Sequence, residues 1–144
     1  MRITCFLPCR KGSERVKNKN FRQFGPHAKG LIEIKLLQLS KVSSIERILL
    51  STNDEEIIDY ASTLQIKNLY IHRRRSELCE SITSTDSLVD HVMELVHEGH
   101  ILWTHVTSPF LNSKIYIEII KSYMTSLEKG YDSLMTVTEL QNFI

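Results

Sequence analysis

Short apolar runs alternate along the chain with longer segments whose apolar residues recur every three or four positions. The short runs predict strands over residues 3–7, 47–51, 68–72 and 100–106, with a fifth beginning at 134–137. The helical spacing predicts helices over 31–42, 84–97 and 114–128, and another whose apolar face runs through 57–64. Because strands and helices alternate from end to end, we expect an α/β protein built of βαβ units around a mostly parallel sheet.

The first apolar run has the composition of a strand buried on both faces, and we expect Pro8 to close it. A basic loop with several glycines then leads to Gly30. The helix after this loop places Ile32, Leu36 and Leu39 on one face, which predicts that this face packs on the sheet.

The length and composition fit one folded domain, 1–144, without a linker or an internal repeat. An apolar fraction of 42% and a charged fraction of 24% exclude a disordered chain. Every apolar run is far shorter than the roughly 20 residues that a membrane-spanning helix needs. The N-terminus lacks a secretory pattern, and three scattered cysteines predict free thiols, so we expect a cytoplasmic protein.

Charge is concentrated in one part of the sequence. The net charge is +1, which argues against a nucleic-acid-binding protein. The loop 10–29 nevertheless holds seven basic residues against one acidic residue, and a second basic run, 73–75, lies far along the chain. Two separate basic clusters on a nearly neutral protein predict a local site for an anion.

The basic loop is placed where an α/β protein binds its ligand. In an open parallel sheet, ligands lie beyond the carboxyl ends of the strands, and this loop follows the first strand. Gly12 and Ser13 allow the backbone to approach a ligand, Arg10 suits a bidentate contact with a phosphate, and Lys19 supplies a mobile charge. The glycine spacing matches neither a Walker A loop nor a dinucleotide fingerprint.

Four motifs in order carry a resemblance to a known family. They are Leu-Pro-Cys-Arg-Lys-Gly-Ser-Glu-Arg-Val-Lys-Asn-Lys-Asn at 7–20, Ser-Thr-Asn-Asp at 51–54, Arg-Arg-Ser-Glu-Leu at 74–78 and Thr-Ser-Pro at 107–109. Together they resemble the acylneuraminate cytidylyltransferases, the CMP-sialic acid synthetases, over essentially the whole chain. The resemblance implies a Rossmann-like nucleotidyltransferase fold, with a mostly parallel sheet and helices on both faces.

The resemblance also implies a reaction and a set of site residues. CTP activates a sialic-acid-like sugar acid with the help of Mg²⁺, giving CMP-sugar and pyrophosphate. Arg10 and Lys19 are the expected catalytic charges. The expected nucleotide-binding residues are Pro8, Cys9, Arg10, Ser13, Lys19, Arg74 and Thr85, with Ser84 as an equally good alignment for Thr85. Asn20 is expected to orient the loop or touch the substrate, and His105 is expected on the sugar side.

The chain departs from the family pattern at three points. Glu14 stands where many members carry a lysine, and His105-Val106 replaces a glutamine and a proline before Thr-Ser-Pro, which favours a different sugar acid. Family members are usually longer, and their metal-binding aspartates and most dimer contacts lie in the later part. We therefore expect the chain to be incomplete at its C-terminal end, to lack assignable metal ligands, and to form a homodimer in its full-length form.

Other interpretations of the same residues stay open. A Kdo-type cytidylyltransferase is suggested by Ser13-Glu14-Arg15, and a non-catalytic nucleotide-binding module by Glu14 and the missing carboxylates. Without the motifs, Arg73-Arg74-Arg75 is a solvated face, His105 a core histidine, and Thr107-Ser108-Pro109 a simple turn.

Overall fold

The computed structural model describes residues 1–12, 16–80 and 83–139. Its strands are β1 (Ile3–Cys9), β2 (Arg47–Thr52), β3 (Leu69–Arg73) and β4 (His100–Trp103). Its helices are α1 (Gly30–Leu39), α2 (Glu55–Thr63), α3 (Thr85–Leu95) and α4 (Ser113–Glu128), with the short 3₁₀ helix η1 (Ser76–Leu78) after β3. Among these residues no helix has both the length and the apolar character needed to cross a membrane.

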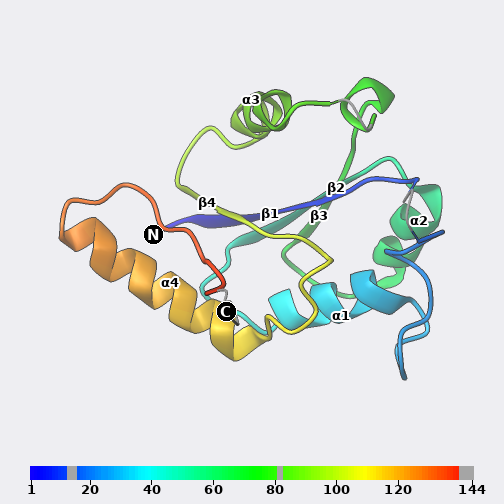
Figure 1. The fold of residues 1–144 in the computed structure, drawn as a ribbon, viewed down its shortest axis with the longest axis horizontal. Helices are drawn as coiled ribbons and strands as arrows, with labels where there is room; N and C mark the ends of the chain where they lie inside the picture. The colour runs from blue at the N-terminus through cyan, green and yellow to red at the C-terminus, as the bar shows by residue number, and fades with distance from the viewer. Residues whose placement is uncertain (13–15, 81–82, 140–144) are drawn as a thin grey trace, which may run out of the picture.

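The four strands form one parallel sheet in the order β3-β2-β1-β4. Helix α3 covers one face, and α1 and α4 lie against the other (Figure 1). This confirms the predicted α/β class with helices on both faces. The central strand β1 is buried along nearly its whole length, as expected for a strand covered on both sides.

Two layers of apolar side chains fill the space between the sheet and its helices. The larger layer lies on the side of α1 and α4 and contains Ile32, Leu36 and Leu39, each with no exposed surface, so the predicted face of that helix is confirmed. The smaller layer joins Phe6 and Val92 on the side of α3, where Trp103 packs edge-to-face on Phe6 with ring centroids 4.9 Å apart.

Three strand predictions are corrected. The strand expected over 100–106 is shorter, since β4 ends at Trp103. Pro8 does not close β1, which continues to Cys9, because a proline near a strand end removes only one ladder donor. The predicted fifth strand at 134–137 is wrong: residues 131–139 have no regular secondary structure, and Met135 and Val137 are more than 80% exposed. An apolar run predicts burial, but a strand also needs a partner for its backbone groups.

Candidate active site

The strand order changes direction between β1 and β4, and the region beyond the carboxyl ends of these two strands is named here the crevice. From β1 the chain moves outward to β2 and β3, and it then returns to place β4 on the other side of β1. Open α/β sheets bind their ligands beyond the carboxyl ends of the strands, at the point where the strand order changes direction. Lys19 and Phe24 of the basic loop, residues 10–29, form one wall of this crevice, and residues 107–111 form the other.

Hydrogen bonds connect the start of the basic loop to Asn20 within the loop and to the segments that follow β2 and η1. Asn20 Nδ2 donates a hydrogen bond to the carbonyl of Arg10 at 3.3 Å, which links these two parts of the loop. The half-buried Arg10 donates from Nη1 to the carbonyl of Cys79 at 3.4 Å. The backbone N–H of Lys11 donates to Asn53 Oδ1 at 2.8 Å, while its side chain is exposed. The loop therefore presents Arg10 from a fixed backbone.

Lys19 and the segment after β4 face a common hollow of about 710 Å³, named here the Lys19 hollow. Most of its lining is apolar. The lining residues are Lys19, Phe24, Leu31, Thr107, Ser108, Pro109, Phe110, Leu111 and Ile115. The structure thus brings together two predicted motifs, the basic loop and Thr-Ser-Pro, although almost ninety residues separate them in the sequence.

Cys9 and Pro8 end β1 directly below the loop. Cys9 is buried, and burial raises the pKa of its thiol to about 12, so the thiol is neutral at physiological pH. A neutral buried thiol is a poor nucleophile. This environment disfavours covalent catalysis by Cys9, and a contact between its backbone and the base stays a prediction.

Arg74 is turned into the protein. Its side chain is only 4% exposed, and its Nη2 and Nη1 atoms donate to the carbonyls of Ser51 at 3.0 Å and Leu78 at 3.5 Å. Burial lowers the pKa of its guanidinium. The solvated face suggested for 73–75 is therefore wrong at Arg74, which ties η1 to the end of β2. A contact between Arg74 and the nucleotide stays a prediction.

The remaining predicted site residues are scattered. Ser13 lies outside the described residues. Thr85 begins α3 and is exposed. Ser84 is the N-cap of this helix, and its hydroxyl accepts a hydrogen bond from the Ser87 N–H at 3.1 Å, which stabilises the start of the helix. His105 follows β4 and is exposed, which corrects its interpretation as a core histidine and leaves it accessible to a ligand.

A pair of imidazoles, the half-buried His72 and the buried His91, was missed by the sequence analysis. His72 on β3 and His91 on α3 lie with ring centroids 5.1 Å apart. The Nε2 atoms of both rings are buried and lack hydrogen-bond partners in the part of the chain that is described. Burial is the main cause that lowers the pKa of both rings. At His72 the next cause of the lowered pKa is the neighbouring His91. Arg74 and Arg75 lower the pKa of both rings further, and Glu94 opposes this at His91.

We expect the free energy of unfolding to fall as the pH drops below about 6.5, where unfolded histidines take up protons. Because the pKa of both rings is lowered in the folded chain, the unfolded state binds more protons in this window. Urea unfolding at about pH 7.5 and about pH 5.5 measures the effect. His91→Gln should flatten the pH dependence and His97→Gln, at an exposed position, should not; equal slopes in all three proteins would contradict the explanation.

The Mg²⁺ implied by the resemblance does not find a protein ligand set here. Within residues 1–12, 16–80 and 83–139, no group of three or more His, Cys, Asp or Glu side chains is placed to hold a metal ion.

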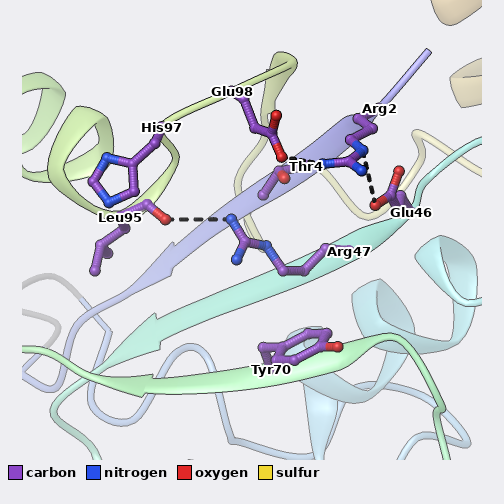
Figure 2. Close-up of a pocket in the computed structure, with 8 residues that line it drawn as sticks. All are labelled: Arg2, Thr4, Glu46, Arg47, Tyr70, Leu95, His97 and Glu98. Carbon is purple, nitrogen blue, oxygen red and sulfur yellow. Dashed lines mark hydrogen bonds and ion pairs between the residues drawn. The ribbon is translucent and has the colours of Figure 1, made fainter.

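A second hollow, of about 580 Å³, lies at the opposite end of the sheet, where the strands begin (Figure 2). Its charges are engaged with one another: Arg2 forms ion pairs with Glu46 and Glu98. Arg47 lies over the ring of Tyr70, and it donates to the carbonyl of Leu95 at 3.3 Å. These contacts tie the amino ends of the strands to the end of α3, so we interpret this hollow as structural.

Comparison with known proteins points to one family. A family model described as Cytidylyltransferase matches residues 4–143. Two curated relatives, the pseudaminic acid cytidylyltransferases of Campylobacter jejuni subsp. jejuni serotypes O:2 and O:23/36, are 26% and 27% identical over 134 residues. Each alignment covers 90% of this chain and 56% of the relative, so the chain spans little more than half the length of these relatives.

Solved structures share the fold. A CMP:2-keto-3-deoxy-manno-octonic acid synthetase complexed with CTP superimposes with a TM-score of 0.67 at 16% identity, covering 88% of this chain and 49% of that one. A cytidylyltransferase from Leptospira borgpetersenii serovar Hardjo-bovis gives a TM-score of 0.61 at 19% identity, covering 87% and 50%. Because the sequence identities are only 16% and 19%, these superpositions show that the fold is shared.

Proposed function

We propose that this chain, which belongs to the cytidylyltransferase family, binds CTP in the crevice between β1 and β4. In this proposal it transfers the cytidylyl group to a sialic-acid-like sugar acid. The observation that carries the proposal is the basic loop: the family match spans it, and the fold places it at the crevice. Pseudaminic acid is the first acceptor to test, because the curated relatives are named for it.

The reaction forms one bond and breaks another. A sugar hydroxyl oxygen attacks the α-phosphorus of CTP, the bond from that phosphorus to the bridging oxygen breaks, and pyrophosphate leaves with the electron pair. The hydroxyl proton passes to solvent or to pyrophosphate. Such a transfer needs mainly positioning and charge neutralisation. In our proposal Arg10 and Lys19 neutralise the phosphates, and the backbone at Pro8 and Cys9 contacts the base.

The acceptor is proposed to enter from the side of the Lys19 hollow. Lys19 lines this hollow together with Thr107 and Ser108, so an acceptor held there lies beside a phosphate-binding charge. His105 is exposed but lines a different hollow, together with Trp103 and Thr104, so its contact with the sugar is the least supported part of the proposal. The three buried free cysteines fit a reducing compartment, and we propose that the protein works in the cytoplasm.

Two other functions remain as competing hypotheses. The fold similarity to the synthetase of 2-keto-3-deoxy-manno-octonic acid, or Kdo, favours that acid as a second acceptor. Glu14, and the lack of a carboxylate cluster for a metal among the described residues, favour a nucleotide-binding module without activity of its own. The homodimer expected of the full-length form stays a prediction.

Calorimetric titration with CTP and with GTP, each with and without Mg²⁺, tests the proposal first. We expect CTP binding with a dissociation constant in the micromolar range, at least about tenfold tighter than GTP binding. Pyrophosphate release in the presence of pseudaminic acid, N-acetylneuraminic acid or Kdo then identifies the acceptor. CTP binding without turnover would indicate the binding module, and no binding of either nucleotide would contradict the proposed site.

A further inference from the structure

A lysine is buried beneath residues 108–111, which belong to one wall of the crevice. Lys35 lies on the core face of α1, one turn from Ile32 and Leu39, and has no exposed surface. A fully buried lysine is rare unless its charge has partners. Its Nζ atom donates to three oxygens: the carbonyls of Ser108 at 2.8 Å and Leu111 at 3.3 Å, and the Tyr116 hydroxyl at 2.8 Å. All three donors of the ammonium are therefore used.

The partners of this ammonium are neutral groups. In the described part of the chain, no carboxylate lies within ion-pair distance of Lys35. Burial lowers the pKa of Lys35 to about 8, so the folded protein carries a desolvated charge at neutral pH. Because that desolvation opposes the gain from the hydrogen bonds, Lys35 is expected to add little net stability.

The hydrogen bonds around Lys35 are complete in both protonation states. The Tyr116 hydroxyl lies 2.6 Å from Thr104 Oγ1, and either oxygen can donate. When Lys35 is charged, it donates to Tyr116, and Tyr116 donates to Thr104. When Lys35 is neutral, two N–H groups keep the carbonyl contacts, the nitrogen accepts from Tyr116, and Thr104 donates to Tyr116. Loss of the proton therefore leaves each contact in place.

These contacts hold the 108–111 turn from below. Lys35 binds the carbonyls at both ends of the turn, and Gln38 Nε2, one turn further along α1, donates to the carbonyl of Pro109 at 2.7 Å. All four residues of the turn also line the Lys19 hollow. The position of this wall relative to the basic loop is thus set by side chains of α1.

We propose that Lys35 is a positioning residue, which fixes the 108–111 turn so that the acceptor is held opposite the phosphate-binding loop, without touching either substrate. The acceptor part of this inference rests on the proposed function. The holding of the turn rests on the hydrogen bonds alone.

Lys35→Met in the full chain tests the inference, because methionine keeps much of the apolar stem and removes all three donors. Lys41→Met, at an exposed position just past α1, is the matched control. Hydrogen–deuterium exchange of the amides of 108–112 is expected to accelerate about tenfold or more in Lys35→Met. The kcat/KM for the acceptor is expected to fall about tenfold while the Kd for CTP stays within about twofold.

The separate readouts distinguish this inference from the proposed function. Unchanged exchange in Lys35→Met overturns the holding of the turn, and equal losses for CTP and acceptor show a general structural role instead. If Lys35→Met does not fold, Tyr116→Phe decides, since it removes one of the three contacts and is expected to accelerate exchange about threefold. If the wild-type chain turns over no acceptor, the proposed function fails, and so does the statement that Lys35 positions the acceptor. Hydrogen–deuterium exchange still tests whether Lys35 fixes the 108–111 turn.

Discussion

Replacing Gly30 by alanine is expected to lower the stability of the protein by about 4 kcal/mol or more, which corresponds to a fall in Tm of more than about 10 °C. Gly30 begins α1 with φ at +62°, a conformation that alanine adopts only with strain. A Cβ atom at this position would also lie 1.9 Å from the carbonyl oxygen of Arg22. Because that oxygen belongs to the backbone, the loop or the helix must move.

Gly130→Ala is the matched control for this substitution. Gly130 has φ at +87°, but an added Cβ would meet no atom within 4 Å. Its replacement is expected to cost only about 1 kcal/mol, the strain of the left-handed conformation alone. Thermal unfolding of both variants measures the difference. Equal losses would show that the close contact at Gly30 is relieved without cost.

The second large effect is expected at Arg10. Arg10→Ala is expected to weaken CTP binding by about 10- to 100-fold, the loss of one or two charge-assisted hydrogen bonds. The half-buried Arg10 starts from a backbone held by Asn20, so little entropy is lost when it grips a phosphate. Lys11→Ala is expected to change the affinity by less than about threefold, since the exposed side chain of Lys11 is replaced while its backbone bond to Asn53 remains.

Calorimetric titration with CTP separates the two neighbouring positions. Arg10→Lys adds a test of geometry, because lysine keeps the charge but loses the planar fork. If Arg10→Ala and Lys11→Ala weaken binding equally, the basic loop acts only as a diffuse positive surface, and the assignment of Arg10 is wrong.

Periodicity was sufficient to predict much of the fold. Ile32, Leu36 and Leu39 recur with helical spacing, and all three are buried where expected. Lys35 lies on the same face by the same spacing, yet lysine is usually exposed, so its burial was not predicted. Its environment is made by the carbonyls of Ser108 and Leu111, which the chain supplies more than seventy residues later.

The candidate site was predictable where it depends on order along the chain. Arg10, Asn20 and Lys19 follow a buried strand, and topology places such residues at the crevice. Arg74 was harder to place, because its direction depends on the carbonyl of Ser51, a long-range acceptor that no local pattern indicates. The same limit applies to His72 on β3 and His91 on α3, whose contact joins a strand to the helix that covers it.

The strand order has a consequence for how the chain reaches its native state. β1 is synthesised first, but its neighbour β4 begins only at His100. One side of β1 can therefore pair only after most of the chain has been synthesised. The pairs β1–β2 and β2–β3 have shorter separations and are expected to form earlier, with β4 docking last. Trp103, the single tryptophan, packs on Phe6 only when β4 has docked, which makes its fluorescence a natural reporter of the final step of folding.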